Sequence, residues 1–441
     1  MAEQYAITGS TATTVAESIE AGIRSGVLAP DSLLPPVRAL ASHLGLSPGT
    51  VAQAYRTLRQ RGVVSTDGRR GTRVRARPAV RARSETRLPV PPGAIDVSTG
   101  SPDPRLLPAY GPVLARFAPE PVLYGRAGTT SRFAEAARRR LRADGVPDEA
   151  VTVTSGCLDG IERVLTAHLS PGDVVGVEDP GWSNLLDLLA ALDLRPTPMA
   201  VDDDGPTPEG VREALAAGAR AVVVTSRGQN PVGSTLTEVR ARALRGVLAK
   251  WPHTVVVEDD HLGELAEHEL HTMAGATRSW AFVRSMSKAY GPDLRCAVLA
   301  GDEETVARVE GRLALGARWV STLLQEVSAR LWDDPATRST IDVARLRYRE
   351  RRDRLLDELA ARGVAAHGRS GLNVWVPVDD ETGVCARLLD AGWVVAPGRM
   401  YRIASGPGIR LTTSALDEAA IVRLADAVAH ALRPRAGVPS V

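Results

Sequence analysis

Only two of the 54 basic residues are lysines, and one of them, Lys288, lies in a segment rich in groups that could bind an anion. This segment, SMSKAYGPDLR, also carries the hydroxyl groups of Ser285 and Ser287 and the guanidinium of Arg295. A lysine that forms a Schiff base with an aldehyde cofactor needs the mouth of a pocket, hydroxyl groups for a phosphate and a fixed cation nearby. A loop lysine is usually just solvated, so the accompanying residues decide the interpretation.

Four other segments carry side chains suited to the same chemistry. Asp259, in VEDDHL, follows an apolar run, where a carboxylate could hold a pyridine nitrogen protonated, cap a helix or bind a metal. No matching set of metal ligands occurs, which disfavours the metal. Asn230, in GQNPVGS, could bond a phenolate oxygen, and Gly156, in TSGCLDGIE, precedes a helix whose first amides could hold a phosphate. Trp182, in EDPGW, could stack on a flat ring or simply belong to the core.

Short Val-rich strands must position these side chains. Apolar runs at residues 174–180, 220–226, 253–260 and 281–287 alternate with helical patterns at 157–169, 183–192 and 237–249. This alternation predicts an α/β domain with a mostly parallel sheet and helices on both faces. Ligands of such sheets bind at the carboxyl ends of the strands, which is where the segments described above begin.

Taken together and in this order, the five motifs resemble the fold-type I pyridoxal phosphate aminotransferases over roughly residues 95–435. The resemblance implies that pyridoxal 5'-phosphate binds as an internal aldimine on Lys288, the catalytic lysine. It implies that Asp259 partners the pyridine nitrogen, that Asn230 partners the phenolate oxygen and that Trp182 stacks on the ring. The residues implied to form the phosphate cup are Ser155, Gly156, Cys157, Ser285, Ser287 and Arg295.

Two further residues matching the family would act on the cofactor and on the substrate. Tyr124, in VLYGRAG, matches a tyrosine contributed across a dimer interface, and Arg410, in GIRLTTS, matches the arginine that binds a substrate or effector carboxylate. Cys157 departs from the family's usual cup residues, which favours backbone amides as the phosphate donors. His261 stands where most relatives have a tyrosine bonded to the phenolate oxygen; its imidazole could donate the same bond and would make the cofactor's electronics pH-dependent.

The N-terminal segment differs in charge from the rest of the chain. Residues 1–93 contain 13 Lys and Arg against 6 Asp and Glu, whereas the remainder contains 41 against 46. Helices are predicted at residues 13–26, in a short segment ending near Gly45, and from about Pro48 to Arg61, followed by the hairpin VVSTDGRRGTRV. This order predicts an α+β winged helix-turn-helix whose last helix enters the major groove, with Arg73 of the wing against the DNA backbone or minor groove.

The same segment resembles the GntR-type winged helix over about residues 12–75. The last helix would bury Val51, Ala54, Tyr55 and Leu58 and turn other side chains outward. The residues predicted to contact DNA, from the resemblance and from their outward or wing positions, are Arg38, Ser47, Thr50, Gln53, Arg69, Arg70 and Gly71. Pro36, Pro48 and Gly49 depart from the family pattern, which removes one expected contact. A trihelical bundle that binds protein is the alternative.

The whole chain is therefore interpreted as a head at residues 1–75, an Arg- and Pro-rich linker at 76–94 and a body at 95–441. This fusion resembles the MocR class of bacterial regulators, and EDDH, SMSKAYGPDLR and RWVSTLLQ resemble its PtsJ-like branch, associated with vitamin B6 salvage. The resemblance implies a homodimeric, cofactor-responsive regulator of double-stranded operator DNA, each head packed against the partner's body, with an amine or amino-acid effector as a further ligand. The alternative is a working aminotransferase with an accessory DNA-binding domain.

Composition excludes several other classes. No stretch approaches 18 consecutive apolar residues and the first residues lack a signal pattern, so we expect a cytoplasmic protein without a membrane partner. The three cysteines lie far apart and show no CxxC spacing, so neither a zinc site nor a disulfide framework is expected.

Overall fold

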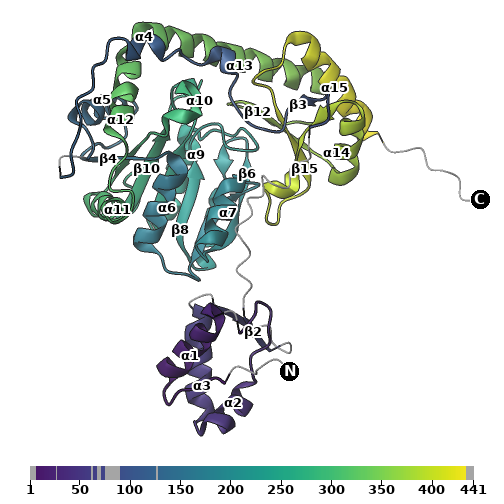
Figure 1. Ribbon diagram of the computed structural model, residues 1–441. Helices are drawn as coiled ribbons and strands as arrows, with labels where there is room; N and C mark the ends of the chain where they lie inside the picture. Colours follow the sequence, from purple (N-terminus) through teal and green to yellow (C-terminus); the bar gives the residue numbers. More distant parts are fainter. Residues whose placement is uncertain are drawn as a thin grey trace, which may run out of the picture. The chain divides into compact units, whose positions relative to one another are not determined.

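The computed structural model describes residues 6–25, 27–60, 63–66, 71–74, 90–125 and 128–433. These residues divide into two units, a head over residues 6–74 and a body that holds most of the residues from 90 onward (Figure 1). Within these ranges, none of the helices combines the length and the apolar character needed to cross a membrane.

The head has three helices and a two-stranded antiparallel ladder within its described residues. The elements are α1 (Ala12–Arg24), α2 (Val37–Leu44), α3 (Pro48–Gln60), β1 (Val64–Thr66) and β2 (Thr72–Val74). Helix α2 ends at Gly45, whose φ of 66° is the left-handed conformation that glycine adopts without strain. The Ser47 hydroxyl accepts the Thr50 backbone N–H at 3.1 Å and so caps α3, as the sequence predicts.

The core of the head confirms the predicted inward face of α3. Val51, Ala54, Tyr55 and Leu58 are all buried, and they pack with apolar side chains of α1 and α2. The predicted first helix ends earlier than expected, at Arg24, and Gly26 lies outside the described residues. The head is therefore a winged helix-turn-helix fold with its own small core.

The body is built on an eight-stranded sheet in the order β4-β11-β10-β9-β8-β5-β6-β7. The strands are β4 (Ala150–Thr154), β5 (Val174–Asp179), β6 (Arg195–Asp202), β7 (Gly205–Pro206), β8 (Ala219–Thr225), β9 (Val255–Asp260), β10 (Ser279–Ser285) and β11 (Ala297–Gly301). Strands β5, β8, β9 and β10 are parallel, and β11 runs antiparallel to β10 and β4. The four predicted strands are thus present and form the buried centre of the sheet.

Helices cover this sheet in packed groups. Helix α6 (Cys157–His168) packs on α11 (Glu303–Leu315) and on β9, β10 and β11, whereas α8 (Pro208–Ala216) packs on α9 (Glu238–Leu248) and on β5 and β8. Helix α5 (Ser131–Ala143) packs on α12 (Thr322–Asp333). The remaining helices of this part are α4 (Gly111–Leu114), α7 (Ser183–Ala191) and α10 (Ser287–Tyr290), with 3₁₀ turns at η3 (Pro104–Leu106), η4 (Gly263–Leu265) and η5 (Pro292–Leu294).

The C-terminal part of the body forms a second core that the sequence analysis did not separate. The 27-residue helix α13 (Pro335–Ala361) crosses to it and packs on α15 (Glu418–Leu432) (Figure 1). Its sheet has the order β12-β15-β14. The remaining elements are β3 (Ile95–Asp96), β12 (Asn373–Pro377), β13 (Trp393–Val394), β14 (Ala396–Pro397), β15 (Gly408–Thr412), α14 (Glu381–Asp390) and η6 (Gly398–Met400). Strand β13 pairs with β3, which joins the start of the body to this part.

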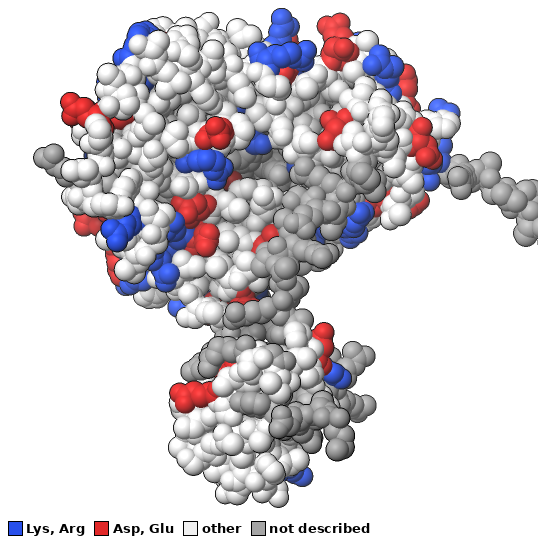
Figure 2. All heavy atoms as spheres, in the orientation of Figure 1, with Lys and Arg blue, Asp and Glu red and all other residues white. Residues whose placement is uncertain are grey.

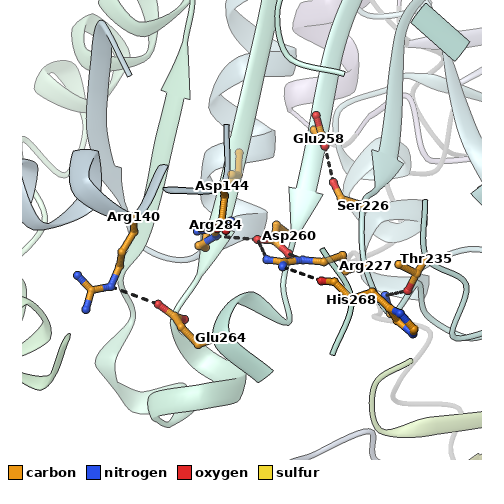
Figure 3. Close-up of polar contacts among 12 residues, drawn as sticks. Arg140, Asp144, Ser226, Arg227, Thr235, Glu258, Asp260, Glu264, His268 and Arg284 are labelled. Carbon is orange, nitrogen blue, oxygen red and sulfur yellow. Dashed lines mark hydrogen bonds and ion pairs between the residues drawn. The ribbon is translucent and has the colours of Figure 1, made fainter. Parts of the chain in front are cut away.

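A buried ion network ties three central strands together. Asp260, the last residue of β9, accepts hydrogen bonds from Arg227 after β8 at 2.7 and 3.0 Å and from Arg284 of β10 at 2.7 Å (Figure 3). Arg284 also pairs with Asp144 at 2.6 Å. Burial alone would raise the pKa of Asp260, but the two guanidinium groups outweigh it and hold that pKa well below its ordinary value.

Removing the shared carboxylate should strongly destabilise the body. In Asp260→Ala two buried guanidinium groups lose their main partner, and breaking a buried pair in this way costs about 3–5 kcal/mol. Asp204→Ala is the matched control, because Asp204 and its partner Arg369 are both 39% exposed and such a pair contributes about 1 kcal/mol or less. Urea unfolding followed by fluorescence compares the two; equal midpoints would contradict the assignment.

Candidate functional site

A cavity of about 360 Å³ lies beside the carboxyl ends of β5, β8, β9 and β10. It gathers ten of the body residues predicted from the sequence: Cys157, Trp182, Asn230, Asp259, His261, Ser285, Ser287, Lys288, Arg295 and Arg410. These residues come from segments up to 253 positions apart, from Cys157 to Arg410, so only the fold brings them together.

The cavity is also lined by residues that sequence analysis missed. They come from the start of the body, from the helix after Trp182 and from the C-terminal part, and include Thr99, Gly100, Ser183, Asn184, Leu372 and Asn373. None of them belongs to a motif that the sequence analysis singled out. Within the described residues, no group of three or more His, Cys, Asp and Glu side chains is placed to hold a metal ion.

Lys288 lies in the short helix α10, directly after β10. Its amine donates a hydrogen bond of 2.5 Å to the carbonyl oxygen of Gly100, which brings the start of the body against the lysine. The Ser285 hydroxyl accepts the Ser287 backbone N–H at 3.1 Å and so fixes the turn that precedes the lysine. The amine is therefore half-buried at the cavity wall rather than solvated in a loop.

Asp259 presents an unsatisfied carboxylate oxygen at the cavity. The residue is 2% exposed, its Oδ2 lies 3.2 Å from Nδ1 of His261, and its Oδ1 has no hydrogen-bond partner among the described residues. Leaving a buried acceptor unpaired is costly, so the arrangement calls for a donor inside the cavity. His261 also contacts Asp259 directly: its imidazole Nδ1 meets the carboxylate that the sequence analysis expects to hold the pyridine nitrogen.

The turn before α6 forms a cradle between backbone amides and a guanidinium. Gly156 has a φ of +100°, and a Cβ atom there would lie 2.8 Å from the Arg295 guanidinium, which donates to the Ser155 carbonyl at 2.6 Å. The amides of the first turn of α6 have no acceptor within the helix. The Ser155 amide, by contrast, donates to Asp159 at 2.8 Å. The cradle thus offers the amides that follow Gly156.

The Cys157 thiol does not add a donor to this cradle. Its Sγ donates to the Val283 carbonyl at 3.5 Å, and burial raises the pKa of the thiol well above its ordinary value. A neutral, buried thiol agrees with the expectation that this position acts through its backbone.

Arg410 and Asn230 are direct neighbours across the cavity. Arg410, in β15, is 2% exposed and donates to Asn230 Oδ1 at 2.9 Å and to the Ser98 carbonyl at 2.5 Å. Its guanidinium carbon lies 5.0 Å from the centre of the Tyr401 ring. The carboxylate-binding and phenolate-binding residues expected from the sequence therefore belong to one hydrogen-bonded unit.

Tyr124 lies away from the cavity of its own chain. The side chain is 78% exposed, and its ring packs edge-on against Trp319 at 5.7 Å, with the Arg318 guanidinium carbon 5.5 Å from the ring centre. Within one chain the structure does not bring this residue to Lys288.

The head displays its predicted DNA-facing residues on and beside α3. Arg38 and Gln53 are exposed, and the hydroxyl groups of Ser47 and Thr50 lie 2.9 Å apart. Gly71 has a φ of +83° and packs so closely that a Cβ atom would lie 2.9 Å from Leu33. Arg73 donates to the Asp31 carbonyl at 2.7 Å. Arg69 and Arg70 lie outside the described residues.

The body offers no basic surface on the face seen in Figure 2, where acidic and basic side chains are interspersed. This face therefore shows no concentration of positive charge of the kind that attracts phosphate without regard to sequence.

A buried glutamate stands beside the cavity. Glu178, in β5, accepts hydrogen bonds from the backbone N–H and the hydroxyl of Thr225 at 2.9 and 2.8 Å, and Thr225 lines the cavity. Burial raises the pKa of Glu178 to about 8, although the Thr225 hydrogen bonds oppose this. Burial thus shifts this side chain toward its neutral form.

Comparisons with known proteins fit both units. Residues 123–428 match the family of class I and II aminotransferases, and residues 11–74 match the gntR family of bacterial regulatory proteins. The vitamin B6 salvage pathway transcriptional repressor PtsJ of Salmonella typhimurium is 39% identical over 97% of this chain and 99% of its own. The pyridoxine biosynthesis transcriptional regulator PdxR of Corynebacterium glutamicum is 29% identical over 57% of each chain.

Solved structures agree on the fold of the body. The kynurenine aminotransferase of Pyrococcus horikoshii has a TM-score of 0.71 with 22% identity, over 78% of this chain and 92% of its own. Several further aminotransferases give TM-scores of 0.63 to 0.70.

Glu178 should make the stability of the protein fall as pH rises. Its folded pKa of about 8 lies above the ordinary 4.5, so the stabilisation is complete below about pH 4.5 and is lost as pH rises toward 8. At about 1.4 kcal/mol per pKa unit, several kcal/mol are involved. Glu178→Gln should therefore gain stability relative to the parent between pH 5 and 8. Urea unfolding across this range measures the difference, with the exposed Glu269→Gln as control; a constant difference would refute the assignment.

Proposed function

Since the chain belongs to the MocR class of GntR-family regulators, which join a winged-helix head to an aminotransferase-like body, we propose that it is a DNA-binding transcriptional regulator whose body binds pyridoxal 5'-phosphate as its sensed ligand. The observation that carries the proposal is the joining, in one chain, of a helix-turn-helix head to a cavity where Lys288, Asp259 and Arg410 meet. A metabolic aminotransferase has no need of such a head.

The residues of the cavity fit this cofactor. Asp259 Oδ1, which lacks a partner, would take the protonated pyridine nitrogen, and Trp182 would cover a ring face. The amides after Gly156 would take the phosphate with Ser285, Ser287 and Arg295. When bound, the cofactor supplies an aldehyde that condenses with the Lys288 amine, losing water, and an electron-withdrawing ring.

Asn230 and His261 would hold the phenolate side of the ring. The Asn230 oxygen accepts from Arg410, so its amide N–H groups are the donors it can offer. His261 keeps Asp259 oriented through Nδ1, which leaves its other ring nitrogen for the ligand. A carboxylate of an amine or amino-acid effector would meet Arg410.

The genes controlled would belong to vitamin B6 metabolism. PtsJ and PdxR carry names that tie them to vitamin B6 salvage and to pyridoxine biosynthesis. A regulator that binds the end product of such pathways could adjust its own supply. We infer that such a regulator acts in the cytoplasm, on double-stranded operator DNA.

The working unit would be a homodimer in which Tyr124 completes the partner's site. Val122, Leu123, Tyr124 and Leu323 are large side chains exposed by 41%, 70%, 78% and 44%, and Val122 and Leu323 share one groove with Trp319. Large apolar side chains exposed next to one another support an interface at this position. Each chain would contribute a head at residues 1–75, a linker at 76–94 and a body at 95–441, with each head packed against the partner's body.

The head would contact DNA through α3 and the wing. Its proposed contacts are Arg38, Ser47, Thr50, Gln53, Arg69, Arg70 and Gly71. The short hydroxyl pair of Ser47 and Thr50 at the start of α3 places two polar groups where a recognition helix first meets the groove.

Lys288 should hold the cofactor covalently. The purified protein with pyridoxal 5'-phosphate should be yellow, and borohydride should fix the cofactor on the chain, whereas Lys288→Ala should bind it only reversibly. Lys250→Ala is a matched control, because Lys250 is the other lysine and is exposed. Mass spectrometry of the reduced protein measures the adduct; an undiminished adduct in Lys288→Ala would refute the site.

Cofactor and operator should alter each other's affinity by the same factor. A ligand shifts an equilibrium only through its differential affinity for two states, and such coupling is typically ~5 to 150-fold. The measurement is operator affinity with and without cofactor, and cofactor affinity with and without operator. Arg38→Ala, which removes an exposed head guanidinium, should weaken the operator complex in both conditions.

Replacing Arg69 and Arg70 in the same assay should lower the salt dependence of binding, because fewer counterions are released. Equal affinities in both pairs of titrations, together with amino-acid turnover near 1 per second or above, would instead support an aminotransferase with an accessory head.

A further inference from the structure

Asp179, at the end of β5, is a buried carboxylate held by one short segment of the C-terminal part. Its Oδ1 accepts the Ile403 N–H and the Ser405 hydroxyl, each at 2.8 Å. Its Oδ2 accepts the Ala404 and Ser405 N–H groups at 2.7 and 2.8 Å. The residue is 5% exposed, and four donors from three consecutive residues satisfy its charge.

The turn that follows Asp179 carries Trp182 into the cavity, and it is anchored to the same segment. The Gly181 N–H donates to the Tyr401 carbonyl at 2.6 Å, and the Gln229 side chain donates to the Pro180 carbonyl at 2.8 Å. Residues 179, 180 and 181 are thus each held by a hydrogen bond, and Trp182, which follows them, lines the cavity.

The segment that holds Asp179 also supports Arg410. Tyr401, 1% exposed, lies under the Arg410 guanidinium, which in turn contacts Asn230. Residues 403–405 end two residues before β15, which carries Arg410. A continuous set of contacts therefore runs from the wall that faces the cofactor ring to the wall expected to face a carboxylate.

We propose that Asp179 is a positioning residue that places Trp182 on the cofactor ring by anchoring its turn to residues 401–405. The inference rests on the proposed function, because it needs the cofactor in the cavity. Only a carboxylate suits the position: in an asparagine, whichever way the amide turned, an NH₂ group would face two of the four donors. Asp179→Asn is therefore isosteric yet breaks the anchor.

A purely structural tie between the same two parts exists elsewhere and supplies the control. Asp203 and Asp204 contact His367 and Arg369 of the C-terminal part, away from the residues that line the cavity. Asp204→Asn thus removes an anchoring carboxylate without touching the Trp182 turn.

The test is titration of the purified apo protein with pyridoxal 5'-phosphate, followed by absorbance and by the visible circular dichroism of the bound cofactor. Asp179→Asn should weaken cofactor binding about tenfold, as expected for lost charge-assisted hydrogen bonds, and should change the dichroism. Asp204→Asn should match the parent in both. In a Trp182→Ala background, Asp179→Asn should have almost no additional effect, since both changes act on one contact.

The inference would be overturned if Asp179→Asn bound the cofactor with the affinity and the dichroism of the parent. It would also be overturned if the losses of affinity caused by Asp179→Asn and Trp182→Ala were fully additive. Either result would leave the proposed function intact. A parent protein that does not bind the cofactor at all would overturn the proposed function instead. If Asp179→Asn does not fold, Ser405→Ala removes one of the four donors from the opposite side and should weaken binding about twofold to fivefold. An unchanged affinity there would also overturn the inference.

Discussion

The site depends on the position of Asp260, held by two buried guanidinium groups. Because Arg227, Asp260 and Arg284 come from the ends of three neighbouring strands, the ion network fixes those ends relative to one another. Side chains alternate across a strand, so fixing Asp260 on one face sets Asp259 on the other, toward the cavity. Ser285 follows Arg284 directly, and Asn230 follows Arg227 by three residues. The ion network therefore fixes the strand ends that carry Asp259, Ser285 and Asn230, which line the cavity.

Close to this ion network, burial raises the pKa of several acidic groups. Two acids and a thiol lie near Asp259, but burial raises the pKa of Glu178 to about 8 and also raises those of Glu258 and Cys157. Hydrogen bonds from Thr225 hold Glu178, and Ser226 and Thr272 hold Glu258. Asp259, with one oxygen unsatisfied, is thereby left as the acceptor that a cationic ring nitrogen can meet.

The sequence predicts the helices, the strands and the chemically distinctive site residues better than it predicts the hydrogen bonds between distant segments. Val-rich runs identify the central strands and the period of apolar residues identifies α3, because the spacing of apolar residues along the chain reflects which faces of an element are buried. Motifs identify Lys288, Asp259 and Arg410 because those residues carry distinctive chemistry. The Gly100 carbonyl on Lys288 and the four donors on Asp179 are not visible in any motif. They join segments that lie far apart in the sequence, and only the folded chain brings them together.

The two-part wall of the cavity bears on how the proposed ligand could act as a signal. The cavity wall belongs to two packed parts of the body. Asp259 lies on the main sheet and Lys288 in α10 just after it, whereas Arg410 lies on the C-terminal sheet. A ligand that touches both parts binds most tightly when the two parts are arranged so that both walls meet it. It raises the population of that arrangement according to the difference between its affinities for the alternative arrangements. A ligand that touched one wall alone would bind all arrangements equally and, however tightly held, would shift nothing. Bridging of the two walls is therefore the property that sensing requires, and Asp179 and Arg410 lie on the contacts that provide it.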